Sequence, residues 1–502
     1  WDKEKKDYVQ DISKTAQTLS KYIDMKPAEI EKILSQKNVS QVEFGSAGKN
    51  LSVETKEKIE NESLPGIKFT ENLSRYYPNG IFASHLIGYT DVEKQEFDGK
   101  TVEQLVGKMG IEAFYNATLT GKPGEVTSRL DGNGYIISGS EEVTEQPKDG
   151  NDLYLTIDKK MQTYLESLVS QVNDKYLPSQ LTAMLVEPKT GNIVAATQRP
   201  TFNGTTKEGI STMWNNLLTD EAYEPGSTMK VLALAAAINE GVFDPNEKYD
   251  SGKIQIFKDL VRDYNKVGWG RITYLESLAH SSNVAFVHVV QKIGVEKWKQ
   301  YLDLFGFGQS TQSGFLNEAN GLNTYNSYLQ QLSTGFGQGI SVTAFQMVQA
   351  FTAIANQGEM KKLRIVDHEF RPASNTTVNF SENSLGQVIK PETAKKTLEY
   401  LRQATTIKDG TSNGFDIEGE EVAAKTGTAE FVNPETGTYY SYGSNYIYSV
   451  VGFAPASNPK YILYITLKQP QNNPYGAGGS ALIKEIFNPM MKRALDYSRL
   501  TQ

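Results

Sequence analysis

The sequence predicts an α+β fold that contains an antiparallel sheet. The runs 446–455 and 461–467 are rich in β-branched and aromatic residues, as strands are. We expect them to pair beside a third strand-like segment, 422–431, in one antiparallel sheet. Helices complete the fold class: 231–238 is apolar on all sides, which a helix can be only when it is buried, and 482–495 has the pattern of a closing helix.

Two domains are predicted, with a boundary near residue 150. The chain of 502 residues exceeds one ordinary domain, and its hydrophobic content of 38% suits a packed protein. Turn-forming residues at 147–150 precede a strand-like segment, 151–158, and a helical pattern over 159–172. We therefore expect a first domain over residues 1–150 and a second over residues 151–502.

The segment 223–230 carries a candidate nucleophile together with its base. Pro225 and Gly226 form a turn ahead of the apolar helix, which places Ser227 in the first helical turn. Ser227 and Lys230 are three positions apart, so they share a face and the lysine can deprotonate the serine. The backbone N–H of Ser227 has no intrahelical acceptor there, so it is free to donate to a developing oxyanion. The positive end of the helix dipole favours the alkoxide.

Short motifs recur by chance, and the surroundings of each copy separate them. The S-x-x-K pattern also occurs at 46–49 and 457–460, in polar stretches with no apolar helix after them. A K-T-G at 189–191 lies between two strand-like runs and is predicted to be a hairpin turn. An S-x-N at 381–383 lies in a polar patch. We expect all four copies to be loops or turns.

Two further motifs follow the serine and lysine in order. Ser281-Ser282-Asn283 lies at a junction between helical segments, and Lys425-Thr426-Gly427 lies in a strand-like context. The ordered set S-x-x-K, S-x-N and K-T-G resembles the penicillin-binding protein and serine β-lactamase superfamily. This resemblance implies an antiparallel sheet flanked by helices, with an additional helical subdomain.

The residue types in these motifs indicate the chemistry. Lys230 can act as a general base only if its pKa falls from about 10.4 by roughly three units. Burial on the apolar helix and the nearby charge of Lys425 both lower it. In this interpretation Ser281 relays a proton between Lys230 and the leaving amine, Asn283 hydrogen-bonds a substrate amide, and Lys425 acts electrostatically.

The K-T-G strand is expected to bind the substrate. Because Gly427 has no side chain, a peptide-like substrate could lie against this strand and pair with it as an added strand. The resemblance implies that the hydroxyls of Thr426 and Thr428 bind the terminal carboxylate of a D-Ala-D-Ala stem peptide. It also implies that the N–H of Thr428 joins that of Ser227 in an oxyanion hole. The implied reaction is acyl transfer through a serine ester, which β-lactams would block by acylating the same serine.

The N-terminal part of the sequence indicates which class within the superfamily this chain resembles. The segments 75–89, 107–115 and 119–121 look like the pedestal motifs of class B penicillin-binding proteins, the monofunctional transpeptidases. The stretch 335–347 also resembles this family. The implied protein is a division-type peptidoglycan D,D-transpeptidase of the low-GC Gram-positive kind, in which an elongated pedestal precedes the transpeptidase domain.

Two alternative functions remain open. A hydrolase, either a D,D-carboxypeptidase or a β-lactamase, would use the same acyl-enzyme, although the E-x-x-L-N signature of class A β-lactamases does not occur and deacylation by water is expected to be slow. A non-catalytic β-lactam sensor would also carry the three motifs, but a long pedestal is not expected of a sensor.

Composition excludes several classes of function. The net charge of −8 argues against nucleic acid as a partner, and the absence of Cys excludes disulfides and thiolate chemistry. The four histidines show no metal-ligand spacing, so neither a metal nor a cofactor is expected. No run reaches the roughly 18 apolar residues of a membrane span.

The resemblance also carries expectations about location and partners. It implies work at the extracytoplasmic face of the cell membrane, with an N-terminal transmembrane anchor that lies outside this sequence. The implied partners are peptidoglycan stem peptides, β-lactam antibiotics, a membrane glycan polymerase, and division or elongation proteins.

Overall fold

The computed structural model of the chain describes residues 8–37, 39, 41–49, 51–70, 74–97, 100–129, 132, 137, 140, 142–430, 445–474 and 478–500. None of the helices in these ranges has both the length and the apolar character needed to cross a bilayer.

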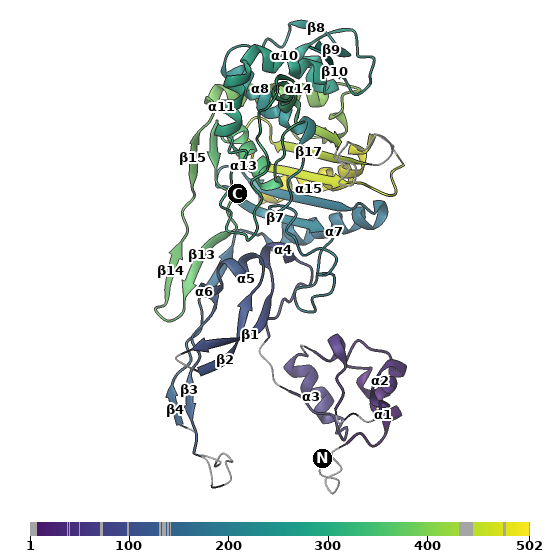
Figure 1. Cartoon of the computed structure of the whole chain (residues 1–502), viewed down its shortest axis with the longest axis vertical. Coiled ribbons are helices and arrows are strands. Elements are labelled where there is room, and N and C mark those ends of the chain that lie inside the picture. The colour runs from purple at the N-terminus through teal and green to yellow at the C-terminus, as the bar shows by residue number, and fades with distance from the viewer. Residues whose placement is uncertain are drawn as a thin grey trace.

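The N-terminal part consists of a small helical cluster and an extended arm of hairpins (Figure 1). The cluster packs α1 (Ile12–Leu19), α2 (Pro27–Leu34) and α3 (Val53–Asn61) around a small apolar core of their own. In the arm, β1 (Thr90–Phe97) pairs antiparallel with β2 (Lys100–Gly107). The other elements of the arm are α4 (Ser84–Ile87), α5 (Gly110–Phe114), α6 (Asn116–Leu119), β3 (Glu125–Thr127) and β4 (Glu142–Glu145).

A five-stranded antiparallel sheet forms the centre of the C-terminal part, in the strand order β16-β17-β18-β6-β7. Its strands are β16 (Ala423–Glu430), β17 (Tyr446–Ala454), β18 (Tyr461–Lys468), β6 (Gln180–Glu187) and β7 (Asn192–Arg199). The register places Lys425 opposite Val451, and Gly427 opposite Ser449. The predicted pairing of 446–455 and 461–467 beside the Lys425 strand is therefore confirmed.

Both faces of the sheet are covered by helices because alternate side chains point to opposite faces and both sets are apolar. On one face, Val450 and Leu463 pack in a core with α7 (Lys159–Tyr176) and α15 (Ser480–Leu500). On the other face, Val451 and Ile462 pack with α8 (Lys230–Asn239), α13 (Ala344–Ala355) and α14 (Pro391–Thr406). The predicted α+β class with flanking helices is confirmed.

Most of the remaining elements surround α8 or connect the two parts of the chain (Figure 1), whereas η1 lies in the N-terminal cluster. The strand expected at 151–158 is β5, which pairs with β13 in a three-stranded sheet, β14-β13-β5. These elements are β5 (Asp152–Leu155), β8 (Lys248–Asp250), β9 (Lys253–Ile256), β10 (Asp259–Arg262), β11 (Arg271–Thr273), α9 (Tyr274–His280), α10 (Asn283–Ile293), α11 (Val295–Leu304), α12 (Tyr328–Ser333), β12 (Glu359–Lys361), β13 (Val366–Arg371), β14 (Thr376–Asn379) and β15 (Ser384–Gln387), with short 3-10 turns at Gly45–Gly48 (η1), Gly226–Met229 (η2), Thr334–Phe336 (η3) and Asn413–Phe415 (η4).

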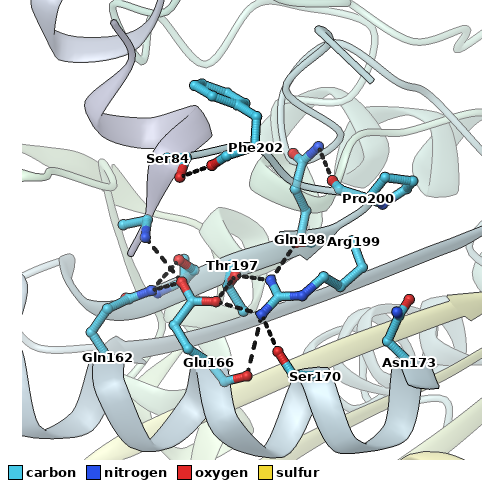
Figure 2. A network of polar contacts seen from close by, with 12 residues as sticks. Ser84, Gln162, Glu166, Ser170, Asn173, Thr197, Gln198, Arg199, Pro200 and Phe202 are labelled. Carbon is cyan, nitrogen blue, oxygen red and sulfur yellow. Dashed lines mark hydrogen bonds and ion pairs between the residues drawn. The ribbon is translucent and has the colours of Figure 1, made fainter. Parts of the chain in front are cut away.

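A buried ionic network joins the arm to the C-terminal part (Figure 2). The carboxylate of Glu166 on α7 accepts hydrogen bonds from the Thr197 hydroxyl at 2.7 Å and the Arg199 guanidinium at 2.8 Å. It also accepts one from the backbone N–H of Ala83, just before α4, at 2.9 Å. Glu166 and Arg199 are both buried, so this contact ties α4 to α7 in the interior of the molecule.

Candidate active site

Ser227 lies in a 3-10 turn rather than in the first turn of an α-helix as the sequence predicted. The turn η2 covers Gly226–Met229, and α8 begins at Lys230. Gly226 has a φ of 56°, which starts the turn in the left-handed region. A 3-10 turn has 3.0 residues per turn, so side chains at i and i+3 eclipse. The corrected geometry therefore aligns Ser227 with Lys230 along one edge.

The glycine-rich stretch after α12 supports this turn. The N–H of Gly226 donates to the carbonyl of Gly337 at 3.1 Å, and the N–H of Gly339 donates to the Glu224 carboxylate at 2.8 Å. A Cβ on Gly337 would lie 2.0 Å from the Gly226 carbonyl oxygen, so only glycine fits there. Sequence reasoning missed this supporting role, for which the spacing of the glycines in 335–339 was the available signal.

Lys230 is completely buried, and its ammonium group contacts the S-x-N motif. The Nζ atom donates to the Ser281 carbonyl at 2.7 Å and to Asn283 Oδ1 at 2.8 Å, and lies 3.3 Å from Ser281 Oγ. These contacts join α8 to the junction between α9 and α10. Ser227, one turn away, is only half-buried, so its hydroxyl remains at the edge of the cluster.

The S-x-N motif occupies the junction that its sequence context predicted. Helix α9 ends at His280, Ser281 adopts a left-handed conformation with a φ of 57°, and α10 begins at Asn283. The Ser281 hydroxyl accepts a hydrogen bond from Lys425 Nζ at 2.8 Å. The hydroxyl of Ser281 thus lies between the side-chain nitrogens of the two lysines, in a place from which a proton could pass to or from Lys230.

The two lysines have lowered pKa values because they are removed from water. Burial is the main cause that lowers the pKa of Lys230 well below its usual value, and the charge of Lys425 lowers it further. The carboxylate of Asp263 acts in the opposite direction. Burial lowers the pKa of Lys425 to about 7, so the charge on Lys425 is itself sensitive to pH near neutrality. The arrangement favours an uncharged Lys230, the form that can accept a proton.

The K-T-G residues lie on β16, with their side chains alternating between the two faces of the strand. Lys425 points to Ser281, whereas the Thr426 hydroxyl lies 3.0 Å from that of Thr411. Thr426 is nearly buried and Thr428 is exposed. Among the strands that the structure describes, β16 pairs only with β17, so its other edge faces the η2 turn and the S-x-N junction.

The absence of a side chain at Gly427 also has a structural reason within the protein. A Cβ on Gly427 would lie 2.3 Å from Ser449 Oγ and 3.2 Å from Thr228 Cγ2. The missing side chain therefore lets the η2 turn pack against the strand. This reason depends on a neighbour in space that sequence alone does not indicate.

Three of the four chance copies of the motifs lie in turns and loops, as predicted, whereas the fourth lies in a short 3-10 helix. The K-T-G at 189–191 is the turn between β6 and β7, and the S-x-N at 381–383 precedes β15 in a loop. The S-x-x-K at 457–460 lies in the turn after β17, where the Ser457 hydroxyl donates to Glu421 at 2.7 Å. The copy at 46–49 begins in η1 of the N-terminal part.

Comparison with known families matches both parts of the chain. The family model described as the penicillin binding protein transpeptidase domain matches residues 181–492. The model described as the penicillin-binding protein dimerisation domain matches residues 2–155.

Individual relatives match over most of this chain. Stage V sporulation protein D of Bacillus subtilis is 32% identical over 471 residues, which are 92% of this chain and 70% of that protein. The peptidoglycan D,D-transpeptidase FtsI of Escherichia coli K12 is 29% identical over 441 residues, which are 86% of this chain and 69% of FtsI.

Solved structures share the fold. Penicillin-binding protein 2X from Streptococcus thermophilus superposes with a TM-score of 0.79 at 31% identity, over 98% of this chain and 74% of that one. Penicillin-binding protein 3 of Mycobacterium tuberculosis in complex with ampicillin gives a TM-score of 0.70 at 27% identity, over 84% of this chain and 89% of that one. Since the transpeptidase model alone matches more than half of the chain, the chain belongs to the penicillin-binding protein transpeptidases, with the dimerisation and transpeptidase domains of a class B protein.

Proposed function

We propose that the protein is a peptidoglycan D,D-transpeptidase that cross-links stem peptides through an ester on Ser227. The observation that supports this most is the convergence of the three motifs at one residue, Ser281. Lys230 and Lys425 both contact Ser281, at 2.7 Å through its carbonyl and 2.8 Å through its hydroxyl, directly beside the η2 turn. Segments more than 140 residues apart in sequence thus contribute to one cluster of groups suited to acyl transfer.

The first half-reaction forms the acyl-enzyme. Ser227 Oγ attacks the carbonyl carbon of the penultimate D-Ala, and uncharged Lys230 accepts the hydroxyl proton. That proton passes through the Ser281 hydroxyl to the nitrogen of the terminal D-Ala as the peptide bond breaks. The leaving D-Ala carries the proton away, and a serine ester remains. Lys425, beside the same hydroxyl, influences this transfer electrostatically.

The oxyanion and the substrate are held by groups on η2 and β16. The backbone N–H groups of Ser227 and Thr428 donate to the tetrahedral oxyanion. Thr426 and Thr428 lie two positions apart on β16, so their hydroxyls emerge on one face, where they bind the terminal carboxylate. The Asn283 side chain binds a substrate amide, and Gly427 keeps η2 close enough to β16 for the two N–H groups to act together.

In the second half-reaction, the amine of an acceptor stem peptide attacks the ester carbon. A new peptide bond forms and the Ser227 hydroxyl is restored. A β-lactam would enter the first half-reaction as a mimic of D-Ala-D-Ala. The relatives support this, because penicillin-binding protein 3 of Mycobacterium tuberculosis was solved in complexes with aztreonam and ampicillin.

We also propose a setting for this reaction. Peptidoglycan is cross-linked outside the cell, so the site works at the extracytoplasmic face of the membrane, held there by an N-terminal anchor. A membrane glycan polymerase and division or elongation proteins are the proposed partners. The division into domains 1–150 and 151–502 belongs to the same proposal, supported by the family matches to residues 2–155 and 181–492.

Intact mass after incubation with penicillin tests the nucleophile. The wild-type protein should gain the mass of one penicillin, whereas Ser227→Ala should gain none and keep the melting temperature of the wild type. Ser457→Ala is the matched control, since Ser457 begins another S-x-x-K copy, and it should label like the wild type. Labelling of Ser227→Ala would remove this serine from its proposed role.

The lifetime of the adduct separates transpeptidase from hydrolase. With a transpeptidase the penicillin adduct should persist for hours, because the sequence has no E-x-x-L-N signature and deacylation by water is expected to be slow. Loss of the adduct within minutes, with release of hydrolysed penicillin, would favour a carboxypeptidase or a β-lactamase instead.

A further inference from the structure

A buried aspartate lies directly behind the S-x-N motif. Asp263 follows β10 and is only 1% exposed. Its Oδ1 atom accepts hydrogen bonds from the Ser282 hydroxyl at 2.8 Å and from the Val284 backbone N–H at 3.1 Å. Its Oδ2 atom accepts one from the Gly252 N–H at 2.7 Å. These three donors compensate a buried carboxylate for the loss of water.

The residue before Asp263 fixes the orientation of the Asn283 amide. Asn283 Nδ2 donates to the carbonyl of Arg262 at 3.2 Å, which leaves Oδ1 facing Lys230 Nζ at 2.8 Å. The two consecutive residues at the end of β10 thus hold the N-terminal end of α10 by a side chain and by a carbonyl. Asp263 is held in turn, because its own N–H donates to the Gly252 carbonyl at 2.9 Å.

We propose that Asp263 is a positioning residue for acyl transfer, which it serves by holding Ser282 and the start of α10 so that Ser281 and Asn283 meet the side-chain nitrogen of Lys230. The inference rests on the function proposed above. Asp263 contacts neither the serine nucleophile nor the proposed substrate groups, and it acts through the S-x-N backbone and through its charge.

An uncharged residue at position 263 would not reproduce both the hydrogen bonds that Asp263 accepts and its negative charge. Asp263 accepts hydrogen bonds on both oxygens, so an asparagine at this position would turn its NH2 group toward a donor. The negative charge also lies at the N-terminal end of α10, where the helix dipole stabilises it. The same charge raises the pKa of Lys230 against the larger effects of burial and Lys425.

The two tyrosines on which the Asp263 charge acts stay uncharged near neutral pH. Burial raises the pKa of Tyr249, on β8, and that of Tyr264, the next residue in the chain. The charges that bear on Lys230 are therefore those of Lys425 and Asp263. Without the Asp263 charge, the Lys425 charge should lower the pKa of Lys230 with no opposing charge.

The test compares rates of acylation by a fluorescent penicillin as a function of pH. Asp263→Asn should acylate about 10- to 100-fold more slowly than the wild type at neutral pH, since small misplacements of catalytic groups have effects of this size. The rise of its rate with pH should also move to lower pH, because the pKa of Lys230 falls. Asp259→Asn, which removes the same charge from β10, the strand just before Asp263, should change neither quantity.

A second variant keeps the test decisive if Asp263→Asn does not fold. Ser282→Ala removes one of the hydrogen bonds to Asp263 but keeps the charge, so it should acylate more slowly with the pH dependence of the wild type. Ser282 also caps α10, so Ser327→Ala, which removes the corresponding cap from α12, is the control for cap loss and should acylate normally.

The outcomes separate the two proposals. A wild-type protein that penicillin does not acylate would overturn the proposed function. Normal acylation of the wild type, together with an unchanged rate and pH profile in folded Asp263→Asn or an unchanged rate in Ser282→Ala, would overturn the role of Asp263 alone.

Discussion

At the scale of single residues, the site depends on two lysines that the fold takes out of water. Lys230 and Lys425 are both at most 1% exposed, and burial is the first cause of the lowered pKa of each. Charged groups in such places reduce stability unless their partners compensate. This loss of stability serves the proposed chemistry, which requires an uncharged amine beside Ser227.

The cost of Lys425 should be measurable as a dependence of stability on pH. Its pKa is about 7 in the folded protein and about 10.4 in the unfolded chain, so between these values the unfolded chain binds more protons and the free energy of unfolding rises with pH. We expect this rise to exceed that of Lys425→Met by about 2 kcal/mol between pH 7 and pH 9.

Chemical denaturation at several pH values checks this expectation. Lys395→Met, at a lysine with an exposed side chain, is the control and should follow the wild type. Parallel curves for the wild type and Lys425→Met would show that Lys425 titrates alike in the folded and unfolded states.

At the scale of elements, glycines set how closely the nucleophile turn approaches its neighbours. Gly226 has its N–H bonded to Gly337, and Gly427 lets Thr228 and Ser449 come together across β16. The turn η2 therefore packs between the 335–339 stretch on one side and the K-T-G strand on the other. The position of Ser227 depends on both contacts.

Gly337→Ala should displace the turn. The new Cβ would lie 2.0 Å from the Gly226 carbonyl oxygen, and the residue has a φ of 81°, so it would bring both a clash and backbone strain. We expect acylation of Ser227 to slow about 100-fold. Gly386→Ala isolates the strain, because Gly386 has a φ of 99° and a Cβ there meets nothing within 4 Å. Equal acylation rates in the two variants would show that the close contact between Gly337 and Gly226 does not position Ser227.

At the scale of the whole molecule, the Glu166 network connects the arm with the C-terminal part (Figure 2). Besides its bond to the carboxylate, the Arg199 guanidinium donates to the Glu166 carbonyl at 3.2 Å and to the Ser170 hydroxyl at 2.8 Å. The Ser84 hydroxyl of α4 donates to the Phe202 carbonyl at 2.6 Å. These contacts join α4 to α7 and to the segment that follows β7.

Glu166→Gln should weaken this junction strongly. It leaves Arg199 buried without a charged partner, and breaking a buried ion pair costs about 3–5 kcal/mol. The melting temperature should fall, and the Ala83 amide should exchange its hydrogen faster. Glu399→Gln, which breaks an exposed pair with Lys395 on α14, should change the stability by less than about 1 kcal/mol. Similar losses in the two variants would show that the network does not anchor the arm.

Much of this protein was predictable from its sequence because its signals are local. The strands 446–455 and 461–467, the buried helix after Lys230 and the loop character of three of the chance motif copies follow from patterns within a few residues. The pairing of Ser227 with Lys230 is also local, since their spacing alone puts them on one edge of a helical turn.

Tertiary structure decided what depends on contacts between distant segments. The η2 turn packs against Gly337 and β16, and the need for glycine at 427 follows from Ser449. The Asp263 carboxylate, 19 residues before Ser282, becomes a partner of the S-x-N motif only when β10 folds against α10. Sequence determines the types of groups and their local geometry; burial and the neighbours of each charge, which set the pKa of Lys230, arise only when the chain is packed.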